Sequence, residues 1–155
     1  MMNIRAHILF LILLSISTLI QATPVDTLTV KVLGIAEDAR FEPVVLQIQP
    51  GDVIRFEVVE GLHTVTAYHP DNRRPQRIPE KARSFDSGML TSGQIWFLTL
   101  EEMGVYDYFC LPHERMGHAG RILVGEIDKI PDYSGGRIPG SIIEMLNRET
   151  EKVLP

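Results

Sequence analysis

The residues best suited to chemistry lie in one short segment near the end of the chain. Cys110, His113 and His118 fall within a stretch of nine residues. A thiolate and two imidazoles are donors that a borderline-soft metal ion such as copper or zinc prefers. An alternating aromatic run precedes the segment and a short apolar run follows it, so we predict a loop between two strands. A four-coordinate site needs one more ligand, and His63, far upstream, is the best candidate.

The arrangement of these residues resembles that of the cupredoxins, the small blue-copper proteins, and in particular their plastocyanin, pseudoazurin and amicyanin branch. In that branch a loop of the form Cys-x2-His-x4-Met joins the last two strands, and an earlier His follows the middle strands. Here the loop reads Cys110-x2-His113-x4-His118, with His63 as the early residue. A Tyr-x-Tyr-Phe-Cys entry and a Gly-x-Ile-x-Val exit complete the likeness, which covers residues 28–124. The resemblance implies one copper ion bound by these four residues.

The fourth of these ligands departs from the family pattern, because His118 stands where the family usually has Met. Imidazole is a stronger and harder donor than a thioether, so His118 is expected to favour Cu(II) and to lower the reduction potential. The alternative is that Met116, or a backbone carbonyl, supplies the axial contact. Thr64 stands where several cupredoxins have Asn, and we expect it to hydrogen-bond across to the segment that contains Cys110.

The N-terminus and the charge balance indicate an exported, acidic protein. Arg5 and His7 precede an apolar run that extends, with small polar interruptions, from residue 8 to residue 20, and Ala22 precedes a break. This is the pattern of a secretory signal peptide over residues 1–22, and the alternative is an uncleaved anchor. We expect a periplasmic or secreted protein without stable membrane insertion after signal cleavage. The remaining chain has a formal charge of −6, which argues against nucleic-acid binding.

Cys110 is the only cysteine in the chain, so no intramolecular disulfide can form. A free thiol in an exported protein would normally pair or be oxidised, whereas a metal-bound thiolate is protected. The alternative is a buried, inert core cysteine. Its position at the start of the predicted loop, three residues before His113, favours the metal ligand.

Alternation of apolar and polar residues predicts seven or eight strands separated by turn signals. The predicted strands cover residues 27–33, 44–48, 53–59, 63–67, 93–100, 104–109 and 120–125. Their number and spacing predict an all-β protein, a Greek-key β-sandwich of the cupredoxin kind, over residues 23–126. Residues 127–155 form a C-terminal extension in which Ser141 can cap a short helix that runs to about Val153. This helix either packs on the sandwich or binds a partner.

Residues 68–92 form a long, polar segment that is rich in Pro and Arg and has no sustained period. Long irregular segments of this kind tend to be functional or mobile. The segment has three acidic residues against five basic ones, namely Arg73, Arg74, Arg77, Lys81 and Arg83. We predict a docking surface for an acidic redox partner over Arg73–Arg83, and the alternative is an ordinary solvated loop. His69, in the same segment, is expected to lie at the surface or near the metal without binding it.

The function implied by the resemblance is electron transfer. We expect an exported mononuclear copper protein that acts as an electron carrier and not as an enzyme, with a cytochrome or a copper enzyme as its redox partner. The alternative is a periplasmic copper-binding protein for copper tolerance or delivery. Copper oxidases and nitrite reductases need additional copper sites, and the sequence has no second cluster of histidines. A zinc site with the same ligands is also chemically permissible.

Overall fold

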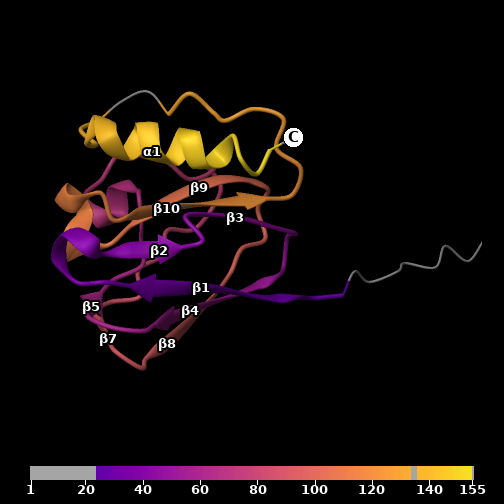
Figure 1. Ribbon diagram of the computed structural model, residues 1–155. Helices are drawn as coiled ribbons and strands as arrows, with labels where there is room; N and C mark the ends of the chain where they lie inside the picture. Colours follow the sequence, from indigo (N-terminus) through magenta and orange to yellow (C-terminus); the bar gives the residue numbers. More distant parts are fainter. Residues whose placement is uncertain (1–23, 134–135, 155) are drawn as a thin grey trace, which may run out of the picture.

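The structure, a computed structural model, describes residues 24–133 and 136–154. Two four-stranded sheets face each other, a two-stranded sheet lies at one end, and a helix covers one of the large sheets (Figure 1). The signal peptide predicted over residues 1–22 lies outside the described residues. Within the described ranges, no helix is both long enough and apolar enough to cross a membrane.

The first sheet has the strand order β2-β1-β4-β8 and shows the alternation that the sequence predicts. In β4, the side chains of Ile54, Phe56 and Val58 are buried and those between them are only partly covered, because successive side chains of a strand point to opposite faces. β1 and β4 run parallel, and the other pairs of this sheet are antiparallel. The bounds are Thr27–Leu33 for β1, Arg40–Glu42 for β2, Val53–Val58 for β4 and Ile95–Thr99 for β8.

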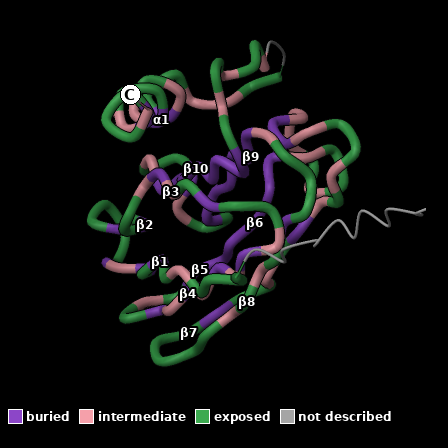
Figure 2. The backbone as a smooth tube through the Cα atoms, turned by 90° about the vertical axis from the view of Figure 1, so that its right-hand side faces the viewer, coloured by how far each residue is buried: buried purple, intermediate pink, exposed green. Residues whose placement is uncertain are grey.

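The second sheet has the order β3-β10-β9-β6, and its two central strands are buried almost throughout. Sheets that are covered on both faces have strands without alternation, and here the first sheet covers one face and the helix α1 the other (Figure 2). The bounds are Val45–Ile48 for β3, Thr66–Ala67 for β6, Gly104–Phe109 for β9 and Ala119–Val124 for β10. The doubly covered strands β9 and β10 are the two that flank Cys110 and His118.

The helix α1, Gly140–Thr150, confirms the predicted C-terminal helix. Its buried residues Ile142 and Leu146 pack against Phe109, Ala119 and a tyrosine of the long segment. The described part of the helix therefore packs on the sandwich, which is the first of the two alternatives. The predicted cap is wrong, because Pro139 occupies the N-cap position and Ser141 lies within the first turn.

Ten strands are present in the described residues, against the seven or eight expected. Two additional strands, β2 and β7 (Leu90–Thr91), have three residues or fewer and are too short to show a period. The predicted strand over residues 63–67 is divided into β5 (Leu62–His63) and β6. β5 pairs with β7, whereas β6 pairs with β9. This division moves the chain from one sheet to another directly after His63, beside the end of β9.

Three short 3-10 segments connect the strands: η1 (Ala36–Asp38), η2 (Pro70–Asn72) and η3 (Leu111–Met116). Between the two large sheets, a cluster of aromatic rings fills the core. The ring of Phe41 lies 4.7 Å from that of Tyr108 and 4.0 Å from that of His118, measured between centroids. The core therefore extends up to the side chains that the sequence predicts as metal ligands.

Candidate metal centre

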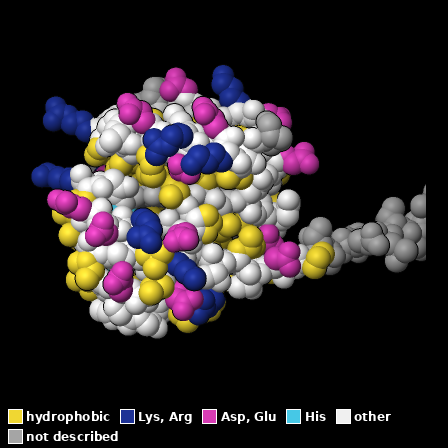
Figure 3. Space-filling model, in the orientation of Figure 1, with side chains coloured by type: hydrophobic (Ala, Val, Ile, Leu, Met, Phe, Trp, Pro, Cys, Tyr) yellow, Lys and Arg dark blue, Asp and Glu magenta, His cyan; other side chains and the backbone are white. Residues whose placement is uncertain are grey.

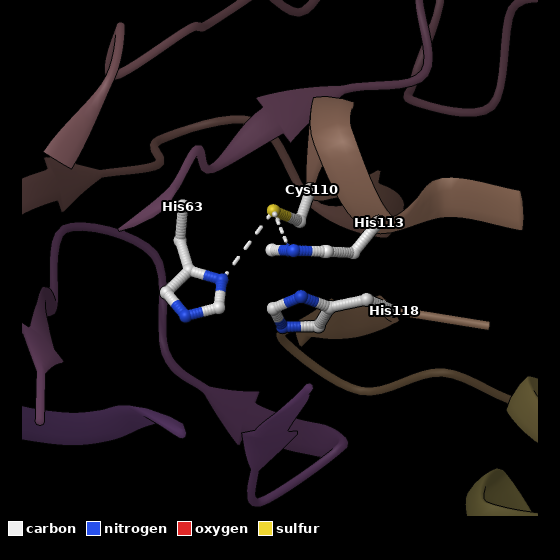
Figure 4. Close-up of side chains that lie close together, drawn as sticks. All are labelled: His63, Cys110, His113 and His118. Carbon is white, nitrogen blue, oxygen red and sulfur yellow. Dashed lines mark hydrogen bonds between the residues drawn. The ribbon is translucent and has the colours of Figure 1, made fainter. Parts of the chain in front are cut away.

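The four predicted ligands meet at one end of the sandwich. One donor atom from each of His63, Cys110, His113 and His118 lies within 4.8 Å of the others. His63 ends β5, Cys110 follows β9, His113 lies in η3 and His118 precedes β10. Figure 4 shows His63 facing the three residues of the loop. All are buried except His113, which is half-buried.

Backbone hydrogen bonds among three of these residues fix the shape of the loop. The Cys110 amide donates to the carbonyl of His118 at 3.0 Å, and the His118 amide donates to that of His113 at 3.3 Å. The His113 amide donates to the carbonyl of Cys110 at 3.1 Å. Gly117 ends η3 with a φ of 91°, a left-handed conformation that glycine adopts without a steric cost. These backbone hydrogen bonds thus fix the positions of the loop residues relative to one another.

The ring of His63 is oriented by two backbone carbonyls. Its Nε2 lies 3.1 Å from the oxygen of Gly34 and 2.9 Å from that of Glu60. Because carbonyl oxygens only accept, Nε2 carries the proton and Nδ1, 3.6 Å from the sulfur of Cys110, keeps a free lone pair. Gly61 makes room for this arrangement, since a Cβ there would lie 2.6 Å from Nε2.

Thr64 links the two ligand segments, as the sequence predicts. The Leu111 amide donates to Oγ1 of Thr64 at 2.8 Å, and the Thr64 amide donates to the sulfur of Cys110 at 3.4 Å. Burial raises the pKa of the Cys110 thiol, and hydrogen bonds from Thr64 and His113 oppose this effect. A metal ion must therefore displace the thiol proton when it binds.

His118 is a buried histidine whose ring nitrogens are free. Its residue is 1% exposed, and neither nitrogen has a hydrogen-bond partner within the described residues. Burial lowers the pKa of His118 to about 3, and the nearby His63 and His113 add to this effect. A contact with the Arg40 backbone acts more weakly in the opposite direction and raises the pKa. The ring is neutral at neutral pH, and a buried polar group without a partner is costly. By contrast, Met116, the alternative axial residue, is 49% exposed.

The residues present fit one copper ion. Two donor atoms that bind the same ion at ~2.0–2.3 Å can lie up to ~4.5 Å from each other. The four donor atoms here lie within 4.8 Å of one another, which is close to that limit. Thiolate and imidazole donors suit both copper oxidation states, and His63 and His118 present free lone pairs. The nitrogens of His118 form no hydrogen bond of good geometry within the described residues, which leaves a lone pair for a metal ion.

A buried charge network beneath the centre was not predicted. Asp107 in β9 lies directly opposite Arg121 in β10, and their side chains are 2.6 Å apart. Arg77 reaches the same carboxylate at 2.8 Å. Arg121 also donates to Asn147 and Thr150, so the network ties α1 to the second sheet. The signal in the sequence was a single charged residue in each of two otherwise apolar strands.

The basic residues of the predicted docking surface over Arg73–Arg83 differ in exposure: Arg73, Lys81 and Arg83 are exposed. Arg77 is only 6% exposed and therefore adds little to the surface. Arg74 donates to the buried carboxylate of Glu114 in η3, at 2.6 Å, and so supports the ligand loop. His69 is not among the four grouped residues, and its Nδ1 accepts the Asp71 amide at the start of η2.

Comparison with known proteins gives a consistent result. Residues 28–125 match the family described as copper binding proteins, plastocyanin/azurin family. Pseudoazurin of Paracoccus pantotrophus is 32% identical over 114 residues, which are 73% of this chain and 72% of that protein. Plastocyanin of Prochlorothrix hollandica is 30% identical over 123 residues, 77% of this chain and 91% of that protein. A pseudoazurin structure from Sinorhizobium superposes with a TM-score of 0.60 at 29% identity, covering 81% and 97% of the two chains.

Proposed function

This chain belongs to the plastocyanin/azurin family of copper-binding proteins, and we propose that it is an exported, mononuclear electron carrier and not an enzyme. The observation that carries the proposal is the group of four donors within 4.8 Å. We propose His63, Cys110, His113 and His118 as the ligands of one copper ion. Copper, when bound, supplies a one-electron couple between Cu(I) and Cu(II).

The protein's part in electron transfer is to hold these donors still. Three of them lie on a loop closed by its own backbone hydrogen bonds, and His63 is oriented by two carbonyls. The ring of His118 packs on that of Phe41. Ligands that are fixed in this way need little rearrangement when the charge of the centre changes, which favours fast electron exchange.

His113 is the proposed ligand nearest the surface, and exposed apolar residues lie on both sides of it in the sequence. Leu111 is 52% exposed and Met116 is 49% exposed, and both lie with His113 in η3. Exposed apolar side chains that gather at one place mark interaction surfaces. We propose that a redox partner contacts the protein here, beside the half-buried edge of His113.

A basic patch, defined as Arg73, Arg115 and Arg137, lies next to this surface. The three residues are exposed and form no ion pair within the described part of the chain. With the Arg74–Glu114 pair they line a hollow of about 760 Å³. In Figure 3 basic side chains project from the upper left edge, close to where Figure 1 places the start of α1. We propose that this patch, which includes Arg73 of the segment predicted over Arg73–Arg83, docks an acidic redox partner such as a cytochrome or copper enzyme.

The proposed function is tested by the spectrum and the redox behaviour of the copper-loaded protein. We expect one copper per chain, a strong thiolate-to-Cu(II) visible band, and reversible one-electron reduction without loss of the metal. Zinc in the same site would give no visible band. Release of copper on each reduction, followed by its capture by a chelator, would instead support the alternative role in copper tolerance or delivery.

Substitution His118→Met is expected to raise the reduction potential. A thioether is a softer donor than imidazole and favours Cu(I). We expect at least a tenfold shift of the Cu(II)/Cu(I) equilibrium, which is ~59 mV for one electron, with a change in the visible and EPR spectra. Met116→Leu serves as the control. If Met116→Leu changes the spectra and His118→Met does not, Met116 is the axial ligand.

Charge reversal in the basic patch is expected to slow electron exchange with an acidic partner. Because steering by charge raises association rates by about 10–10³, we expect Arg73→Glu with Arg137→Glu to reduce the rate by about tenfold at low salt. The difference should vanish at ~1 M salt, where screening is nearly complete. Arg148→Glu, an exposed reversal on α1, is the control. Equal effects of the control and the patch variants would refute docking at this patch.

A further inference from the structure

A chain of hydrogen bonds leads from the ligand loop to the protein surface. The Leu111 amide donates to Oγ1 of Thr64 at 2.8 Å, the hydroxyls of Thr64 and Thr66 are 2.8 Å apart, and Thr66 lies 2.9 Å from Oδ1 of Asp86. Both threonines are buried, whereas Asp86 is exposed. The chain thus connects the residue after Cys110 with a carboxylate that is not itself near the ligand group.

Counting protons fixes the direction of every bond in this chain. A carboxylate only accepts and a hydroxyl has a single proton, so Thr66 donates to Asp86. The oxygen of Thr66 must then accept from the hydroxyl of Thr64. Thr64 therefore gives its proton to Thr66 and uses its oxygen to accept the Leu111 amide.

The Thr64 hydroxyl has a second possible acceptor, the sulfur of Cys110. Oγ1 of Thr64 accepts the amide of Leu111, the residue that follows Cys110, so the hydroxyl lies beside the Cys110–Leu111 peptide. The sulfur already accepts the Thr64 amide at 3.4 Å. Hydrogen bonds to the cysteine sulfur are among the determinants of the reduction potential in copper sites of this type.

We propose that Asp86 is a positioning residue that orients the Thr66–Thr64 chain, keeps the Thr64 hydroxyl proton away from the Cys110 sulfur, and so lowers the reduction potential of the centre. The proposal rests on the proposed function, because it presumes copper bound at Cys110. A sulfur with fewer hydrogen bonds is the stronger donor and favours Cu(II). Asp86 and His118 then act in the same direction.

The segment that carries Asp86 is held in place independently of the chain. Asn72 donates to the carbonyl of Phe85 at 3.1 Å and to Ser84 at 3.0 Å, and the Val65 amide donates to Ser87 at 2.8 Å. The carboxylate of Asp86 also accepts the Gly88 amide at 3.2 Å, but the bonds of Phe85 and Ser87 hold the backbone on both sides of residue 86 without it. Substitution of the side chain tests its effect on the hydroxyls without unfolding the segment.

The discriminating variant is Thr66→Val, which keeps the carboxylate and the side-chain shape but removes the acceptor of the Thr64 proton. That proton then has the sulfur as its remaining partner. We expect the Cu(II)/Cu(I) equilibrium to shift towards Cu(I) by roughly tenfold, which is ~59 mV, and the thiolate band to move. Asp86→Asn should shift both in the same direction, because a carboxamide can donate to Thr66 and reverse the chain.

A second measurement, by NMR, locates the hydroxyl proton of Thr64. In the diamagnetic Cu(I) protein, NMR should show a nuclear Overhauser effect between the Thr64 hydroxyl proton and the β protons of Cys110 in Thr66→Val but not in the wild type. The amide of Leu111 should stay protected from exchange in both proteins, because its bond to Thr64 is retained. Thermal unfolding of the copper-free variants checks that the fold is intact.

The outcomes separate the possible causes. A raised potential in Asp86→Asn with no change in Thr66→Val would show a simple charge effect and overturn the proposal. Unchanged potentials in both variants would overturn it as well, while the visible band of the wild type would leave the proposed copper function in place. Absence of that band from the wild type would instead refute the proposed function.

Discussion

Copper-loaded Cys110→Ser is expected to lose the intense visible absorption of the wild type. The band requires a thiolate bound to Cu(II), and a serine hydroxyl neither ionises readily nor offers a soft donor. Loss of a residue that only hydrogen-bonds to a metal ligand lowers metal affinity by roughly 10–100-fold. Loss of the proposed ligand Cys110 itself should lower the copper affinity by more than this. Serine differs from cysteine by one atom, so the sandwich should fold. Absorption, EPR and a competition titration with a chelator measure the effect.

The matched control for this experiment is His69→Ala. His69 lies outside the group of four, where its Nδ1 accepts a backbone amide, so its removal should leave the band and the copper affinity unchanged. Persistence of the band in Cys110→Ser would show that the ligand assignment is wrong.

Substitution Asp107→Ala is expected to cause the largest loss of stability. Asp107 is fully buried and is the carboxylate shared by Arg77 and Arg121. Removing one partner of a buried ion pair costs about 3–5 kcal/mol, because it leaves an uncompensated buried charge. We expect the free energy of unfolding to fall by about this amount in urea or guanidinium titrations at neutral pH.

The control for Asp107 is Asp132→Ala, an exposed position at which substitutions usually change stability by less than about 0.5 kcal/mol. A change of similar size at both positions would show that the buried network contributes little to stability. The triple variant Arg77→Met, Asp107→Leu, Arg121→Met replaces the whole network at once. Because replacing a whole buried ionic group by apolar residues is often neutral or stabilising, this variant tests whether the intact network stabilises the fold.

The strands and three of the four candidate ligands could be predicted from the sequence because each left a local signal. Apolar residues at every second position indicate a face turned to the core, and the bounds predicted for β1 and β9 are those observed. Cys110, His113 and His118 were predicted from their chemical types and their spacing. These features depend on residues that are close together in the chain.

The remaining features depend on contacts between distant segments. The carbonyl of Gly34 that orients His63 comes from 29 residues earlier, and Arg77 is 30 residues from Asp107. The docking prediction counted every arginine of the long segment as exposed to solvent. Arg77 is instead buried, where it pairs with Asp107. No spacing within the segment distinguishes Arg77 from Arg73, so the sequence could not show that Arg77 is buried while Arg73 is exposed.

The strand order of the second sheet governs when a newly synthesised chain can fold. β3 is made early but pairs with β10, the last strand to leave the ribosome, and α1 must follow before Arg121 finds Asn147 and Thr150. Pairing between distant parts of a chain is slow, because the loop between them must close first. Nearly the whole polypeptide is therefore complete before the sandwich can close. Such late closure would suit the export that we propose, because a chain passes through a translocation pore in the unfolded state.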